Sequence, residues 1–202
     1  MKPKLKNVLR DLELQIKANN NLIDNIKRLK INYFQLEIIT EFAFLRIFMA
    51  WEIFLEDSFL RYLVGTKSPS GYEPKLKIDC KNMVIARGIL SPDGGKIIKW
   101  NSPSDIISRA SKYFKDGEPY TTNLETISTY FQEMNTIRNR ITHKSDESKQ
   151  KFINFIRRKF GYGIRGITPG RFLLRKFNQN KNYSFLDFYI DVIKSSSLKI
   201  VP

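Results

Sequence analysis

The order of hydrophobic and polar residues predicts two long helices in the first third of the chain. From Leu5 to about Lys30, apolar residues recur at spacings of three and four, as in an amphipathic helix. Residues 32–64 are apolar almost all the way round, and Gly65 follows them as a helix stop. We therefore expect a long helix pair, with the second helix buried at the centre of an α-helical bundle.

Residues 66–103 change character, because Pro and Gly become frequent there. The sequence SPDGG separates two short apolar runs, MVIARGIL and KIIKW. This pattern predicts a loop or a small β-hairpin inserted into the bundle.

Helical spacing returns after this insertion. Residues 102–115 predict a helix with Ser102 or Ser104 as its cap, and a final helix is expected from about Ser184. We expect a single all-α domain over residues 1–202, a HEPN-like arrangement by the resemblance described below. Residues 161–202 would form a basic loop and a C-terminal helix packed on the bundle.

The helix of greatest interest is expected between Thr122 and His143. Thr122 and Glu125 have the spacing of a capping box, and one apolar stripe runs along the segment. Just beyond His143, Ser145 is placed to cap a further helix. The pattern therefore places His143 at a junction between two helices.

Composition supports a folded protein with polyanionic partners. Hydrophobic residues make up 42% of the 202 residues, which is too apolar for a disordered chain. The formal net charge is +15, and residues 144–202 carry thirteen Lys or Arg against four Asp or Glu. Such a balance favours nucleic acid, although a soluble protein that is merely basic remains the alternative.

The residue types that are rare in this chain exclude two kinds of site. Cys80 is the single cysteine and His143 the single histidine, so the chain can form neither an internal disulfide nor a structural zinc site alone. We expect a cytoplasmic protein without metal or cofactor. The N-terminus has no signal-peptide pattern, and charges interrupt the apolar residues 38–64, so we expect no membrane span.

Arg138, Asn139 and His143 are the candidate catalytic residues. Asn139 and His143 are four residues apart on a polar stripe without formal charge, whereas Arg138 points along the apolar stripe and needs a partner or a cleft. On an ideal helix Arg138 and His143 lie about 140° apart. One ligand could meet both only if the helix unwinds at its end or a second subunit supplies one of them.

This junction suits phosphate chemistry. The N-terminus of the helix after Ser145 presents free N–H groups, to which a phosphate can bind. His143 could move a proton to or from a ribose oxygen, and Arg138 could neutralise the negative charge that develops on phosphorus. Further cations lie close in sequence and are candidates for binding the RNA backbone: Arg140, Lys144, Arg157 and Arg158. A basic last turn is equally explained as compensation of the helix dipole.

Two carboxylates of the central helix, Glu52 and Glu56, lie one turn apart and are second candidates at the site. Either they contact the catalytic residues, or they pair with Arg46, Arg61 or a backbone group, as buried carboxylates usually do. Sequence spacing alone leaves both interpretations open.

The sequence IRNRITHKSDESKQKF resembles the Arg-Asn-x-x-x-His motif of HEPN domains. MAWEIFLEDSFLRYLVG is similar to the central helix of the RiboL-PSP and MAE types of that family, and KWNSPSDIISRASKYFKDGEPY to their middle segment. Together these segments cover about half of the chain. The chain departs from some HEPN toxins at Ser145, where they carry a tyrosine that a partner enzyme modifies.

The resemblance implies a helical, dimeric, metal-independent ribonuclease. Arg138 and His143 would be its catalytic pair, Asn139 would help to orient His143 or the phosphate, and the pairs of two subunits would face one cleft. It also implies a toxin or antiphage-defence role, with an antitoxin or another defence protein as a further partner. The rival hypotheses are a non-catalytic module that binds RNA, DNA or protein, and a structural subunit of a defence assembly.

Overall fold

The computed structural model describes residues 4–29, 31–91, 98–178 and 182–202, and over these residues the chain is helical without a β-strand. An all-α fold is therefore confirmed. The elements are α1 (Leu5–Lys27), α2 (Tyr33–Leu63), α3 (Met83–Leu90), α4 (Pro103–Tyr113), the 3₁₀ turn η1 (Lys115–Gly117), α5 (Thr121–Thr126), α6 (Ser128–Thr142), α7 (Asp146–Phe160), α8 (Pro169–Leu174) and α9 (Phe185–Ile200).

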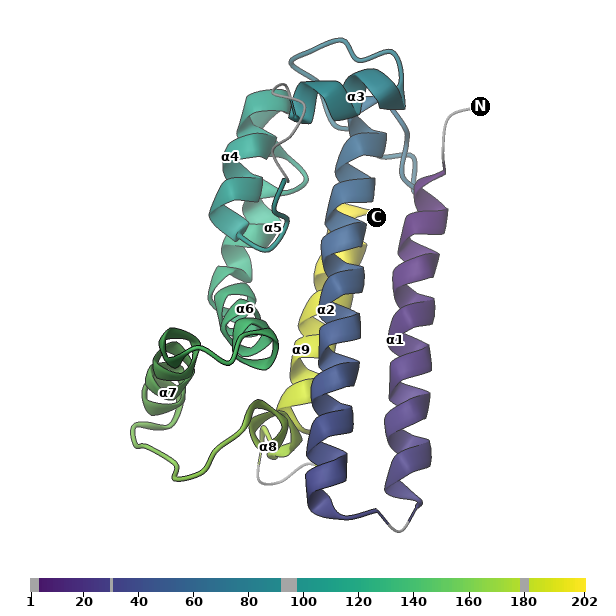
Figure 1. Cartoon of the computed structure of the whole chain (residues 1–202). Helices are drawn as coiled ribbons and strands as arrows, with labels where there is room; N and C mark the ends of the chain where they lie inside the picture. Colours follow the sequence, from purple (N-terminus) through teal and green to yellow (C-terminus); the bar gives the residue numbers. More distant parts are fainter. Residues whose placement is uncertain (1–3, 30, 92–97, 179–181) are drawn as a thin grey trace.

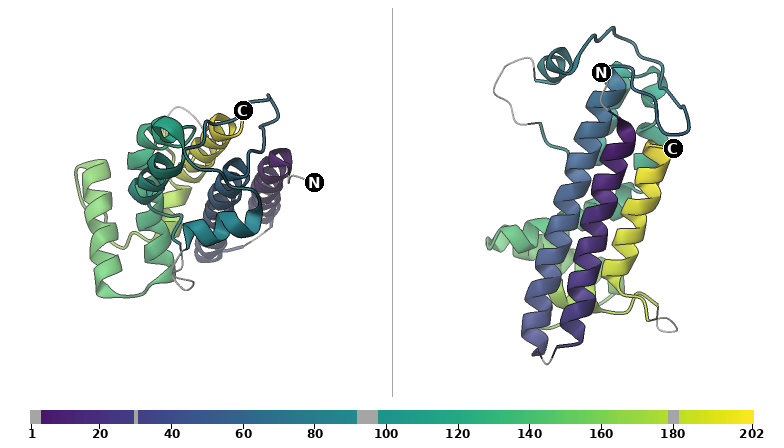
Figure 2. Two further views of the ribbon diagram at one scale, coloured as in Figure 1. Left: turned by 90° about the horizontal axis from the view of Figure 1, so that it is seen from above. Right: turned by 90° about the vertical axis from the view of Figure 1, so that its right-hand side faces the viewer.

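The predicted long helix pair is formed by α1 and α2, which run antiparallel along most of the molecule (Figure 1). α2 has 31 residues and is about 46 Å long. Asn32 and Gln35 form a capping box at its start, and Gly65 follows its end with a φ of 67°. α9 packs against both helices, and Figure 2 shows the three side by side.

The remaining helices cover another side of α2. α4, α5 and α6 follow one another along it, and α7 packs on α6 at the edge of the molecule farthest from α1 (Figures 1 and 2). Aromatic rings fill the space between α2 and this layer. Phe59 of α2 contacts the rings of Trp100, Phe114 and Tyr120, and Trp51 is fully buried. Phe131 of α6 contacts the rings of Phe48 and Trp51, and these contacts hold α6, with its candidate site, against α2.

The insertion contains a helix rather than a hairpin. The run MVIARGIL, predicted as a possible strand, is α3, because the Asn82 side chain accepts hydrogen bonds from the first free backbone N–H groups, those of Val84 and Ile85. An isolated bridge between Leu76 and Phe114 ties the insertion to the end of α4. The SPDGG sequence and the start of KIIKW fall largely outside the described residues.

The predicted start of the site helix is wrong. Thr122 lies inside α5, and its backbone N–H and hydroxyl both donate to the carboxylate of Glu118 instead of forming a capping box with Glu125. At Ile127 the backbone leaves helical geometry, and α6 begins at Ser128. The end of the helix is as predicted, since α6 stops at Thr142.

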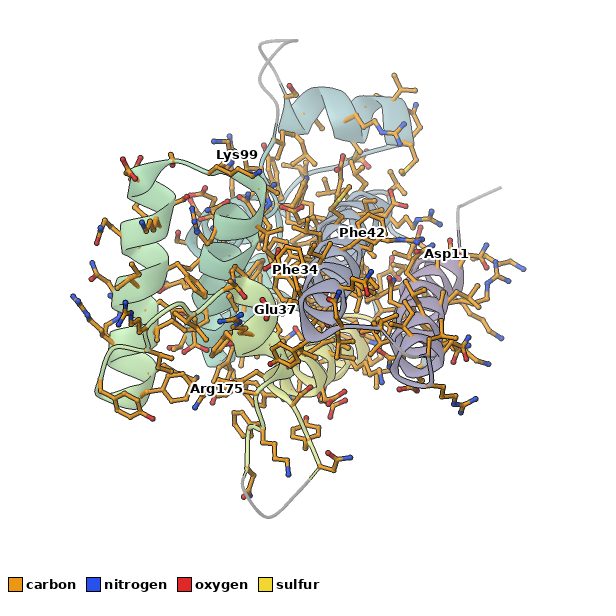
Figure 3. The ribbon with its side chains drawn as sticks, turned by 60° about the horizontal axis from the view of Figure 1, so that its bottom comes forward. Asp11, Phe34, Glu37, Phe42, Lys99 and Arg175 are labelled. Carbon is orange, nitrogen blue, oxygen red and sulfur yellow. The ribbon has the colours of Figure 1, made fainter. Side chains whose placement is uncertain are left out.

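One face of α2 is not covered, contrary to the prediction of an entirely buried central helix. Five large apolar side chains of α2 are between 50% and 64% exposed: Phe34, Ile38, Phe42, Met49 and Ile53. We call them the open face of α2; Phe34 and Phe42 are labelled in Figure 3. At 100° per residue they lie within roughly 100° of arc, on one side of the helix. No described helix is both long and apolar enough to cross a membrane.

α8 was not predicted, although the sequence contains its start signal. The Thr168 side chain accepts from Arg171 N–H, and Pro169 occupies the first helical position. Glu37 of α2, 2% exposed, binds this helix: its Oε1 accepts from Arg171 Nε at 2.6 Å and its Oε2 from Thr168 Oγ1 at 2.8 Å. The basic segment is thereby fixed to α2.

Candidate functional site

The backbone at the end of α6 determines where His143 lies. α6 ends at Thr142, and His143 has the extended dihedral angles φ −119° and ψ 121°. Its N–H still donates to the Asn139 carbonyl oxygen at 2.9 Å. Ser145 then caps α7, where its side chain accepts from Ser148 N–H at 3.3 Å. His143 therefore belongs to a tight link between two helices rather than to an ideal helix.

Arg138, Asn139 and His143 line one cavity of about 590 Å³. Its other walls come from two places: Met49, Glu52, Ile53 and Glu56 of α2, and residues 98–101 before α4. The separation of about 140° expected on an ideal helix does not apply, because the chain leaves helical geometry at His143. Both candidate catalytic side chains therefore reach the same cavity within one chain.

Asn139 contacts Arg138 directly. Arg138 Nη1 donates a hydrogen bond to Asn139 Oδ1 at 2.9 Å. This contact orients the guanidinium and leaves the Nδ2 group of Asn139 as a donor toward the cavity. The family resemblance assigned Asn139 to His143 or the phosphate, whereas its hydrogen bond in the structure is to Arg138.

Glu52 and Glu56 line the cavity with the candidate catalytic residues, and they do not pair with Arg46 or Arg61. Arg46 donates to Gln15, and Arg61 donates to Asp57 and to the Lys4 carbonyl oxygen. Of the two interpretations of these carboxylates, contact with the site is the one that the geometry supports.

Different neighbouring charges act on the pKa values of Glu52 and Glu56. Burial raises the pKa of Glu52, and the positive charge of Arg138 offsets only part of this effect. Burial also raises the pKa of Glu56, as does the neighbouring Asp57, while Arg87 and Arg109 act in the opposite direction. Glu52 is therefore the carboxylate that shares the field of Arg138.

Arg140 stabilises the junction of α6 and α7 through Ser148. Its Nη1 donates to Ser148 Oγ at 3.3 Å, and that hydroxyl donates to the His143 carbonyl oxygen at 2.6 Å. Ser148 is 8% exposed, so this hydrogen-bond chain is shielded from water. In the structure Arg140, predicted to bind RNA, braces the backbone of His143.

The other predicted RNA-binding residues lie on the surface. Lys144 is exposed beside His143, and Arg157 and Arg158 are exposed in the last turn of α7. Twelve helical residues separate Ser145 from Arg157, or about 18 Å along the helix axis. Arg157 and Arg158 are thus distant from the cavity, on the same helix that begins at it.

Lys99 and Asn101 belong to the cavity but were not singled out from the sequence. Only the packing of residues 98–101 across α2 and α6 brings them there, and no local pattern indicates it; Lys99 is labelled in Figure 3. In the described part of the chain, no group of three or more His, Cys, Asp or Glu side chains could hold a metal ion.

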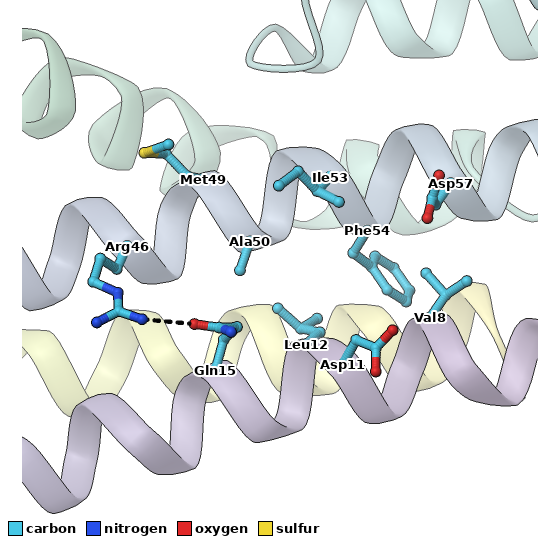
Figure 4. Close-up of a pocket in the computed structure, with 10 residues that line it drawn as sticks. All are labelled: Val8, Asp11, Leu12, Gln15, Arg46, Met49, Ala50, Ile53, Phe54 and Asp57. Atoms are coloured by element: carbon cyan, nitrogen blue, oxygen red, sulfur yellow. Dashed lines mark hydrogen bonds between the residues drawn. The ribbon is translucent and has the colours of Figure 1, made fainter.

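A second hollow borders the site. A cavity of about 330 Å³ lies between α1 and α2, and the Arg46–Gln15 hydrogen bond of 3.2 Å spans it (Figure 4). Met49 and Ile53 stand on its rim away from α1 and also line the candidate site. The open face of α2 is therefore continuous with the cavity that contains His143.

The chain matches no family model, no curated protein and no solved structure, so its functional assignment depends on the cavity and its chemistry.

Proposed function

We propose that the protein is a metal-independent endoribonuclease of the HEPN type. The observation that carries the proposal is the cavity that Arg138, Asn139 and His143 line together at the junction of α6 and α7. The order of these residues is that of the Arg-Asn-x-x-x-His motif, and all three are among the residues that line the cavity. An ordinary solvated helix end would not bring an arginine, an amide and the single histidine into one hollow.

The reaction proposed is attack by the ribose 2′-hydroxyl on the adjacent phosphorus. His143 accepts the hydroxyl proton as the 2′ oxygen bonds to phosphorus, and the bond from phosphorus to the 5′ oxygen breaks. The leaving 5′ oxygen takes up a proton from water, His143 returns its proton to solvent, and the products are a 2′,3′-cyclic phosphate and a 5′-hydroxyl. Arg138, oriented by Asn139, neutralises the charge on the phosphate oxygens.

RNA is the proposed substrate because the chain carries a net charge of +15. Lys144 beside His143, and Arg157 and Arg158 farther along α7, would bind the RNA backbone at and beyond the cut. Their contacts would be independent of sequence, since phosphates carry no base information.

We also propose a homodimer. The open face of α2 carries five exposed large apolar side chains, and exposed apolar patches of this kind often mark interaction sites. Because Met49 and Ile53 belong to both the open face and the cavity, a second copy seated there would form one wall of the site. The resemblance to HEPN proteins further supports a toxin or defence role with a partner antitoxin.

Cleavage of RNA by purified protein tests this proposal. Because general acid–base catalysis by one side chain contributes about 10²- to 10⁴-fold, we expect His143→Ala to reduce cleavage at least about 100-fold. Arg138→Ala should also reduce it, whereas Arg10→Ala, an exposed arginine on α1, should leave it unchanged. The wild type should spare DNA and remain active in EDTA.

Two outcomes would contradict the proposal. If wild-type protein binds RNA without cutting it, with or without added divalent metal, the chain is a binding module. If His143→Ala cuts as fast as the wild type, the nuclease site lies elsewhere.

A further inference from the structure

The cavity at the α6–α7 junction is larger than a phosphate requires. Its volume of about 590 Å³ is within the range of pockets that hold whole small molecules, roughly 300 to 1,000 Å³. Arg138 and His143 line this cavity. Lys99, Trp100, Asn101 and Asn135 also line it, so the cavity offers an indole and amides in addition to cationic groups.

Asn135, which lines this cavity, has an unsatisfied polar atom. It lies one turn before Asn139, on the same face of α6. Its Oδ1 is buried and accepts no hydrogen bond from any described residue. A buried amide oxygen without a donor is unfavourable, so the Asn135 amide gains a hydrogen bond if its side chain turns this oxygen toward a ligand N–H group in the cavity.

Asn139 complements this acceptor. Its Oδ1 is engaged by Arg138 Nη1 at 2.9 Å, which orients the amide and leaves Nδ2 as a donor. The two amides thus present an acceptor and a donor one helical turn apart. A nucleobase carries a donor next to an acceptor on its Watson–Crick edge, and this edge is free only in unpaired RNA.

Apolar surfaces complete the cavity. Trp100 is 4% exposed, and the Arg109 guanidinium lies 4.7 Å from the centroid of its ring, which fixes the indole in place. Met49 and Ile53 face the same hollow from α2. A flat aromatic base can lie against the exposed side chains of Met49 and Ile53 and hydrogen-bond at its edge.

We infer that this part of the cavity holds an unpaired nucleobase of the RNA, and that Asn135 discriminates among the four bases. The inference rests on the proposed ribonuclease function, since it names the substrate feature that the same site recognises. It predicts cleavage in single strands or loops at positions set by base identity, because a paired base cannot enter the cavity.

Titration of the intact protein with the four nucleoside 3′-monophosphates tests the inference without relying on cleavage. Hydrogen-bond readout of a base gives about tenfold or greater discrimination, so we expect the wild type to bind its preferred nucleotide at least about tenfold more tightly than the weakest. Asn135→Ala should reduce this ratio below about threefold and leave the affinity for base-free ribose 5-phosphate unchanged. Asn7→Ala, an exposed asparagine on α1, should change neither.

Stability separates recognition from a structural role. Because Oδ1 of Asn135 has no partner, Asn135→Ala should fold with an unchanged or slightly higher melting temperature. A variant that melts well below the wild type would assign Asn135 to the core and overturn the inference. So would a wild type that binds all four nucleotides within about threefold, or binds none, or an Asn135→Ala protein that keeps the preference.

Cleavage mapping then distinguishes the two hypotheses. Base-selective binding without RNA cleavage would refute the proposed nuclease and leave the base pocket standing. Cleavage whose sequence preference is the same in Asn135→Ala would refute the base pocket and leave the nuclease standing.

Discussion

At the scale of single residues, His143 illustrates how a backbone change makes a site. On an ideal helix, Arg138 and His143 would lie about 140° apart. In the structure α6 ends at Thr142, and the extended conformation of His143 brings this residue to the cavity that Arg138 lines. The Ser148 hydroxyl donates to the His143 carbonyl oxygen, and Arg140 in turn donates to that hydroxyl.

Glu52 can be used to test whether burial or the charge of Arg138 dominates the electrostatics of this cavity. Burial raises its pKa above the ordinary value of 4.5, so the folded state disfavours the ionised carboxylate more than the unfolded state does. The resulting penalty is present at neutral pH and disappears below about pH 4.5, where both states are protonated. We expect Glu52→Gln to raise the melting temperature at pH 7, and this gain to vanish as the pH falls to about 4.

Melting followed by circular dichroism between pH 4 and pH 7 measures this effect, and Glu147 provides a control of opposite sign. A hydrogen bond from Lys151, together with its charge, lowers the pKa of the exposed Glu147. Glu147→Gln should therefore cause a small loss of stability at pH 7 that fades on acidification. A destabilised Glu52→Gln at pH 7 would mean that attraction to Arg138 outweighs burial.

At the scale of elements, the contact between α8 and α2 depends on a glycine. A Cβ atom on Gly170 would lie 2.5 Å from the Glu37 carbonyl oxygen, which is backbone and cannot move freely. Forced overpacking costs about 1–3 kcal/mol, so we expect Gly170→Ala to lower the free energy of unfolding by about 2 kcal/mol. Urea unfolding measures the change.

Gly88 is the matched control. It lies within α3, and a Cβ atom there would meet nothing within 4 Å. Gly88→Ala should be neutral or stabilise the protein by up to about 1 kcal/mol, because alanine favours a helix. Equal effects at the two positions would show that the close approach of α8 to α2 is not what restricts Gly170.

The sequence predicted those elements whose signals are local. Asn32 and Gly65 mark the ends of α2, and Ser145 and Gly161 mark those of α7, because caps act within one turn. α3 was misassigned since a short apolar run does not distinguish a helix from a strand. α8 was overlooked inside a glycine-rich segment, although Thr168 and Pro169 are a recognisable start.

The candidate site was predictable only in part, for the same reason. Arg138, Asn139 and His143 are neighbours in sequence, so spacing alone identified them. Lys99 and Asn101 come from a distant segment, and only tertiary packing brings them to the cavity. The partner of Arg140 was missed because Ser148 belongs to the next helix.

At the scale of the whole molecule, two surfaces are candidates for binding partners: the exposed cations of α7 and the open face of α2. The exposed cations belong to α7, at the edge of the molecule farthest from α1 (Figure 1), whereas the open face belongs to α2, where Met49 and Ile53 also line the α1–α2 cavity. A protein of charge +15 repels copies of itself, so association must come from the apolar face. The proposed dimer and the proposed RNA surface are thus chemically distinct.

Phe42 is the position at which to test the dimer, because it is 55% exposed on the open face and does not line the cavity. We expect the wild type to sediment as a dimer at micromolar concentration and Phe42→Glu as a monomer, since a carboxylate in an apolar contact loses its hydration. Leu14→Glu, at 54% exposure on α1, is the matched control and should remain dimeric. If the dimer closes the cavity over Met49 and Ile53, Phe42→Glu should also cut RNA more slowly, with full activity retained in Leu14→Glu. A wild type that is monomeric at every concentration would refute the dimer, and the open face of α2 would then belong to a different partner.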